Sequence, residues 1–298
     1  MARQSEVGSS GGLKSEQLIG ALERAAAGNS ADLYRQLEML SGLPGPRMNT
    51  ILAAGFALDC ARLGAKVDRL IWDMASLPAN EARGASGKEF LSVCGVLGIG
   101  ARAAVAKDLQ VKALSMLEDR ADDLRFHVRD AVPLALASMG AKMPDLPGRV
   151  MPWMDRYFHA AAVILALAEP VWLETFGKND YEAPFELLEA AYQLAHNAPR
   201  AAQRYPGHKA LVDALAKVPT DFAKRFGLPM LDKLLAWAEK SRPELRDAIL
   251  ANLTDTGLKK PYGDEIEKIK AAVIVSKGPP RDPSRIVQGM RGRGKKRR

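Results

Sequence analysis

Two arginines spaced four residues apart could bind successive phosphates of a nucleic acid. Arg125 and Arg129 fall in a segment with helical spacing of its apolar residues, and residues four apart share one face of a helix. Two guanidinium groups on one face can each form hydrogen bonds with phosphate oxygens across an inner surface. Ion pairing is the alternative, because Asp122, Asp123 and Asp130 are within helical reach of these arginines.

The highest density of charge lies at the end of the chain. The whole sequence has a net charge of +8, while residues 281–298 hold eight Lys or Arg and one acid. This segment therefore carries +7 and leaves +1 for residues 1–280. Such a segment gains affinity for DNA or RNA through counterion release, although it could instead solubilise the chain or contact an acidic protein. The predicted contacts are Arg291, Arg293, Lys295, Lys296, Arg297 and Arg298.

A histidine close to a carboxylate suggests acid–base chemistry. His127 precedes Asp130 by one helical turn, and a carboxylate can orient a histidine as a base. No nucleophile or second acid accompanies them, so a packed or capping histidine is the simpler interpretation. The spacing of the other histidines does not match a metal site, and motifs for nucleotide binding, serine hydrolysis or zinc proteolysis do not occur. We therefore predict no catalytic residue, no metal ion and no cofactor.

Aromatic residues offer one further type of site. Trp153, Tyr157 and Trp172 could form a platform on which an exposed base stacks. Two of them flank an apolar helix, which favours packing in the core instead.

The apolar residues recur at intervals of three and four, which is typical of helices, and no segment alternates in the manner of a half-buried strand. Leu211, Leu215 and Phe222 belong to one such stripe, in which Pro219 predicts a kink or a break. Two helix starts have the form of a capping box, in which a Ser and a Glu three residues later satisfy the first free amides. These are Ser86 with Glu89, and Ser241 with Glu244.

One segment of the chain is repeated. Phe126–His127 followed by Ala131–Ala137 recurs as Phe158–His159 followed by Ala162–Ala168, an offset of 32 residues for the first element. An interval of this kind is typical of stacked helical units that bury their apolar faces against one another. We therefore predict an all-α protein, an α-solenoid of stacked antiparallel helical hairpins.

Several segments resemble bacterial HEAT-repeat proteins related to the DNA alkylation-repair HEAT-like superfamily. The similar segments are Ser41–Arg47, Phe90–Gly100, Asp123–Leu136, Ala160–Pro170 and Pro243–Leu253. The resemblance implies HEAT-like repeats and a concave surface that DNA could follow. The alkylation-repair enzymes also carry an aromatic residue followed four residues later by an acid. This sequence has no such Trp and Asp pair, because Trp72 with Asp73 and Trp153 with Asp155 have other spacings.

Three regions differ in composition: a polar start at residues 1–13, a helical repeat domain at 14–276, and a basic tail at 277–298 that we expect to be disordered. The start lacks the apolar core of a signal peptide, and no apolar run reaches the roughly 18 residues that span a membrane. Cys60 and Cys94 lie in apolar stretches and are expected to be reduced core residues. We therefore predict a cytoplasmic protein with no membrane partner.

Three functions agree with these features. The first is a non-enzymatic binding protein that contacts nucleic acid, mainly through its tail. The second is a DNA glycosylase of the alkylation-repair type, and the third is a protein–protein scaffold. The charge of the inner groove distinguishes them, because a basic groove with an acid at its centre favours the glycosylase. A neutral groove favours the scaffold.

Overall fold

The computed structural model describes residues 15–276, and within this range the chain is all-helical without any strand. The α-helices are α1 (Ser15–Ala26), α2 (Ala31–Leu40), α3 (Thr50–Leu63), α4 (Asp68–Ala75), α5 (Gly87–Val105), α6 (Gln110–Ala121), α7 (Phe126–Gly140), α8 (Leu146–Val150), α9 (Tyr157–Ala168), α10 (Pro170–Leu173), α11 (Glu182–His196), α12 (Pro206–Leu215), α13 (Val218–Phe226), α14 (Leu228–Lys240), α15 (Pro243–Asn252), α16 (Thr256–Lys259) and α17 (Gly263–Ser276). Short 3-10 helices are η1 (Gly64–Val67), η2 (Lys107–Leu109), η3 (Met151–Asp155) and η4 (Arg200–Arg204).

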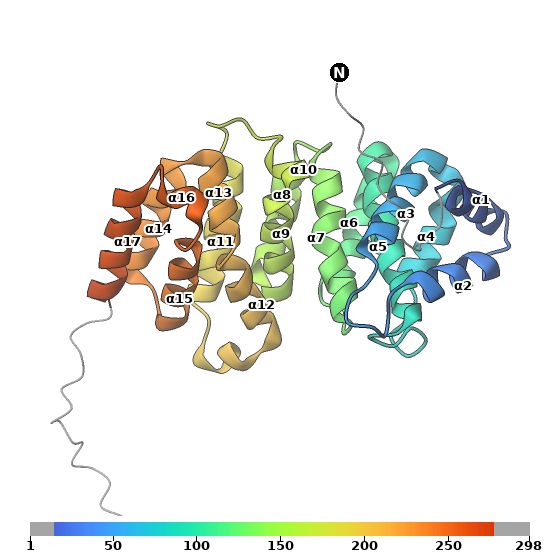
Figure 1. Ribbon diagram of the computed structural model, residues 1–298, viewed down its shortest axis with the longest axis horizontal. Coiled ribbons are helices and arrows are strands. Elements are labelled where there is room, and N and C mark those ends of the chain that lie inside the picture. Colours follow the sequence, from blue (N-terminus) through green and yellow to red (C-terminus); the bar gives the residue numbers. More distant parts are fainter. Residues whose placement is uncertain (1–14, 277–298) are drawn as a thin grey trace, which may run out of the picture.

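The helices follow one another along the long axis of the molecule in chain order (Figure 1). One row of neighbours consists of α3, α5, α7 and α9, and it continues through α12 to α15. Each helix of this row packs against the next, while α4 packs against α5 and α6 against α7. The core is therefore shared between consecutive helices along the whole row.

Helices α5 and α7 run in the same direction. Arg125 at the start of α7 donates a hydrogen bond to Ser92 near the start of α5. Farther along both helices, a Cβ added to Gly100 would lie 2.6 Å from Cα of Ala135. Because the early turns of the two helices are in contact and their later turns are also in contact, the two helices are parallel.

Helix α5 is buried along almost its whole length because small residues let its neighbours approach closely. At Gly95 a Cβ would lie 2.3 Å from the backbone nitrogen of Ala75 in α4, closer than any side chain can be placed. Glycines at this position and at Gly100 therefore bring α4 and α7 against α5. The short distances between backbones place α5 at the centre of the N-terminal half.

The helix boundaries confirm some expectations and correct one. Ser86 caps α5 by accepting a hydrogen bond from the amide of Glu89, whose carboxylate accepts from the amide of Ala85. Pro219 marks a break, because α12 ends at Leu215 and α13 begins at Val218. The second predicted cap is wrong.

Helix α15 starts at Pro243, and its N-cap is Arg242 rather than Ser241. A proline is favoured at the first helical position because its missing N–H is not needed there. The preceding residue then becomes the cap. Ser241 instead is buried and hydrogen bonded with Tyr192 at 2.6 Å.

Other expected core residues are buried. Cys60 and Cys94 are free and fully buried, and burial raises the pKa of both thiols. Trp153 and Trp172 are buried too, as expected for core side chains rather than a stacking platform. Among residues 15–276, no helix combines the length and the apolar character that crossing a bilayer requires.

Candidate functional site: an apolar groove between α3 and α7

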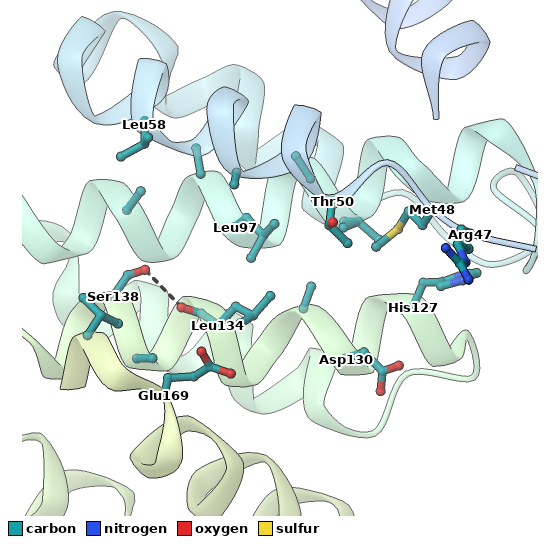
Figure 2. Close-up of a pocket in the computed structure, with 18 residues that line it drawn as sticks. Arg47, Met48, Thr50, Leu58, Leu97, His127, Asp130, Leu134, Ser138 and Glu169 are labelled. Atoms are coloured by element: carbon teal, nitrogen blue, oxygen red, sulfur yellow. Dashed lines mark hydrogen bonds between the residues drawn. The ribbon is translucent and has the colours of Figure 1, made fainter. Parts of the chain in front are cut away.

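A groove of about 720 Å³ lies between α3 and α7 (Figure 2). Helix α3 forms one wall, α7 forms the other, and α5 forms the floor. Figure 2 also shows that α3 and α7 run in the same direction, since Thr50 and His127 lie at one end and Leu58 and Ser138 at the other. The apolar lining consists of Met48, Ala53, Ala54, Ala57, Leu58, Val93, Leu97, Ala101, Ala131, Leu134, Ala137 and Val171.

Large apolar side chains of this groove are open to solvent. Leu58 is 61% exposed, Leu134 is 40% exposed and Val171 is 55% exposed. They come from α3, α7 and α10, so elements that are distant in sequence build one apolar surface. A cluster of exposed apolar side chains within a hollow is typical of a surface that binds a partner. Small alanines between them leave room for the side chains of that partner.

Charged side chains lie at the two ends of the groove (Figure 2). Arg47, His127 and Asp130 are at the end where α3 and α7 begin, and Glu169 is at the opposite end. Neither carboxylate has a hydrogen bond or ion pair with another side chain in the part of the chain that the structure describes.

Burial raises the pKa of Glu169, and the charge of Asp221 raises it further. Burial likewise raises the pKa of Asp130, against the opposing effect of Arg129 and His127. Glu169 is half-buried, whereas Asp130 is exposed. A cationic group brought beside Glu169 would stabilise its charged form.

His127 is oriented by a different acid from the predicted one. Its Nδ1 lies 2.9 Å from Oε2 of Glu89, a carboxylate with 0% exposure. The same oxygen accepts a hydrogen bond of 2.6 Å from the amide of Ala85. Asp130 makes no hydrogen bond with His127. The sequence identified Glu89 only as a helix cap, since 38 residues separate it from His127.

Arg125 differs most from its expected position, because it is only 3% exposed. Its Nε and Nη2 each donate a hydrogen bond of 2.8 Å to the carboxylate of Asp123. Its Nη1 donates to Oγ of Ser92 at 3.0 Å and to the carbonyl of Ala82 at 3.2 Å. This guanidinium links α7 to α5 inside the protein and is not on an inner surface. Of the two alternatives, the ion pair with Asp123 is the one observed.

Arg129 does not point in the same direction as Arg125. Arg125 is the N-cap of α7 and has extended backbone angles, so helical spacing does not relate the two side chains. Arg129 donates to the carbonyl of Asp123 and lies over the ring of Phe158, 4.6 Å from its centroid. The cation–π contact between Arg129 and Phe158 thus helps to hold α9 against α7. The two arginines do not form a paired phosphate site.

The six predicted nucleic-acid contacts of the tail lie outside the described residues. They are Arg291, Arg293, Lys295, Lys296, Arg297 and Arg298.

The Trp and Asp pairs considered for base excision are not in the groove. Lys112 lies 4.6 Å from the ring centroid of Trp72, and Asp73 pairs with Arg69 at 3.8 Å. Trp153 is buried, whereas Asp155 is exposed. None of these four aromatic or acidic side chains lines the groove.

Over residues 15–276, no group of three or more His, Cys, Asp or Glu side chains could hold a metal ion. Comparison of the sequence with protein-family models and with curated proteins finds no match. The arrangement described above is suited to noncovalent binding of an apolar segment, with charged groups that can recognise its ends.

Proposed function

We propose that this chain is a non-enzymatic binding protein, in which HEAT-like helical hairpins hold a helical segment of a partner protein in the groove between α3 and α7. The observation that carries this proposal is the open apolar lining of the groove, with Leu58, Leu134 and Val171 exposed. Transfer of such side chains from water to a protein contact is favourable by about 1.5–3 kcal/mol for each fully buried residue.

The order of the helices supports a solenoid. In stacked hairpins, the first helices of consecutive units are neighbours and run in parallel. Helices α3, α5, α7 and α9 pack in that order, and α5 and α7 are parallel. The repeated Phe and His pairs fall at matching places, Phe126–His127 at the start of α7 and Phe158–His159 at the start of α9. These matching places support the proposal that the repeated sequence marks a repeated helical unit.

The charge of the groove favours a protein partner. Arg47 is opposed by Asp130 and Glu169, so the lining is close to neutral rather than basic. A surface that binds the phosphate backbone needs several cations close together. The glycosylase alternative is also less favoured, because it requires a basic groove with an acid at its centre.

The length of the groove suits a short amphipathic helix. The lining residues of α7 run from His127 to Ser138, which corresponds to roughly 17 Å at 1.5 Å per residue. A partner helix of about three turns covers this distance. Apolar residues at intervals of three and four along that helix would face Leu134 and Leu58, as in other complexes where a helix lies in a groove.

We also propose that the basic tail contacts DNA or RNA, or an acidic protein partner, independently of the groove. This part of the proposal rests on charge alone, since residues 281–298 carry +7. The two contacts would use separate surfaces, so one partner does not have to displace the other.

Selection from a displayed library of random helical peptides tests the groove. Peptides selected on the full chain should bind at least about tenfold more weakly to Leu58→Glu and Leu134→Glu, because each change puts a charge against an apolar face. Val111→Glu is the matched control, because Val111 is 72% exposed on α6 and does not line the groove. Circular dichroism of each variant checks folding. If the library yields no binder, or only binders that are insensitive to both groove changes, the groove is not the binding site.

A further inference from the structure

We propose that the bound helix lies antiparallel to α3 and α7, with a basic first turn at Glu169 and an acidic last turn at Arg47 and His127. This inference rests on the proposed function, because it assigns the direction and the charge pattern of the helix in the same groove. Three features of the groove carry it: the common direction of its helices, the acid at one end, and the guanidinium of Arg47 at the other.

The first feature is the alignment of the helix dipoles. Helices α3 and α7 both begin at the end marked by Arg47 and His127 (Figure 2), and α5 runs parallel to α7. Each helix carries about half a positive charge at its N-terminus and half a negative charge at its C-terminus. The groove is therefore electropositive at one end and electronegative at the other. A further helix is stabilised there only when it runs in the opposite direction.

The second feature is Glu169 at the electronegative end. Its carboxylate has no hydrogen-bond or ion-pair partner among residues 15–276, and burial raises its pKa. Any cation brought beside the carboxylate of Glu169 stabilises its charged form. The N-terminal turn of a partner helix supplies free amides and, with Lys or Arg in that turn, a full positive charge. Ser138 and Val171 line the same end and would contact the side chains around that turn.

The third feature is the guanidinium of Arg47 at the electropositive end, with His127 beside it. Arg47 is exposed, and its guanidinium has no side-chain or backbone partner in the described part of the chain. Nδ1 of His127 lies 2.9 Å from Oε2 of Glu89, and in the neutral tautomer in which Nδ1–H donates to that carboxylate, Nε2 is an acceptor that meets an N–H or O–H group of a ligand. The guanidinium of Arg47 supplies the donors for the free carbonyls of a helix C-terminus and for an acidic side chain there. Glu89 acts as a positioning residue for His127.

Asp130 lies at the electropositive end and opposes this pattern. Burial raises the pKa of Asp130, and the charges of Arg129 and His127 act against that rise. Arg129 does not line the groove, so the acidic last turn of the partner is expected to contact Arg47.

The inferred charge pattern identifies an unusual class of partner. An isolated helix is stabilised by acids in its first turn and bases in its last turn. The partner helix inferred for this groove has the reverse pattern. It carries Lys or Arg in its first turn, Asp or Glu in its last turn, and apolar residues between them. A selection that rewarded only helix formation would therefore yield the opposite pattern.

Two stapled peptides of about 14 residues test this inference on the full chain by fluorescence polarisation. Both have the same apolar face and the same staple, which fixes their helicity. One carries Lys in the first turn and Glu in the last turn, and the other carries the reverse. The first should bind roughly tenfold more tightly. In the double variant Arg47→Glu with Glu169→Lys, the preference should invert.

Disulfide crosslinking reports the direction independently of affinity. A cysteine at the N-terminus of the first peptide should link to Ser138→Cys and not to Thr50→Cys, which lie at opposite ends of the groove. The native Cys60 and Cys94 are buried and do not compete. Equal binding of both peptides, lost in Leu134→Glu, would overturn the direction and leave the proposed function standing. Crosslinking at Thr50→Cys, or binding of neither peptide, also overturns the inference, while the library selection decides the proposed function separately.

Discussion

Nδ1 of His127 lies 2.9 Å from Oε2 of Glu89, so a fully buried carboxylate at the start of α5 holds a histidine at the start of α7. The same carboxylate oxygen accepts the amide of Ala85. Glu89 thus caps its own helix and aligns a neighbouring one.

Replacement of Glu89 by alanine should lower the free energy of unfolding by about 2–3 kcal/mol, since a helix cap and a buried hydrogen bond are both lost. Urea denaturation measures the change. Glu81→Ala is the control, because Glu81 is exposed and surface changes stay within about 0.5 kcal/mol. Equal stability of the two variants would mean that the buried pair contributes nothing.

Two glycine substitutions should have opposite effects on stability. Gly100→Ala places a methyl group 2.6 Å from Cα of Ala135, and such overpacking costs about 1–3 kcal/mol or more. Gly55→Ala in α3 meets no atom within 4 Å, so the better helix propensity of alanine should stabilise the chain by up to about 1 kcal/mol. Thermal unfolding of both variants tests the pair. A stable Gly100→Ala protein would contradict the close packing of α5 against α7.

Asp123 should contribute to stability in a way that depends on pH. Burial raises its pKa, but the hydrogen bonds and charge of Arg125, together with Arg120, outweigh burial and lower the pKa below its ordinary value. A lowered pKa gives stability that is present above the unfolded value and lost as pH falls through the folded value. Asp123→Asn should therefore be less stable at pH 7, and the difference from the wild type should shrink in acid.

Urea denaturation across the acidic range measures this difference. Asp122→Asn is the control, since Asp122 is exposed. A constant difference at all pH values would show that the lost charge is not the cause.

Glu169 should show the opposite dependence. Burial, followed by the charge of Asp221, raises its pKa, so its charged form costs stability above the folded value and this cost disappears below the unfolded value. Glu169→Gln should be more stable than the wild type at pH 7 and equal to it in acid. Thermal unfolding at both conditions checks the sign. A gain in stability with weaker peptide binding would be typical of a residue kept for function.

Removal of residues 281–298 should weaken nonspecific nucleic-acid binding, since the deletion takes away +7 of the net +8. If the tail makes about five phosphate contacts, the slope of log affinity against log salt should become shallower by roughly four to five. Filter binding at several salt concentrations measures the slope. If the truncated chain binds DNA and RNA as the full chain does, the tail is not the contact.

The helices could be predicted from the sequence because apolar spacing and helix capping depend on residues that are close together in the chain. Apolar spacing of three and four marks the faces that pack, and the Ser86 cap depends only on residues beside it. Ser241 does not cap α15, because Pro243 fixes where that helix begins and Ser241 is hydrogen bonded with Tyr192.

The groove could not be predicted in the same way. Leu58 and Leu134 have the sequence surroundings of core residues, and only the separation of α3 from α7 by α5 leaves them open. The spacing of Arg125 and Arg129 predicts one helical face, but α7 begins at Phe126 and Arg125 is its N-cap. The acid that meets His127 comes from another helix, and no spacing within one helix indicates it.

The row of helices has a consequence for the synthesis of the protein. Because α3, α5 and α7 find their packing partners among helices next to them in sequence, little of the chain has to be made before these contacts can form. Residues up to the end of α7 include every wall of the groove except the part formed by Glu169 and Val171. We therefore expect the N-terminal half to reach a compact state on the ribosome while α12–α17 are still being translated.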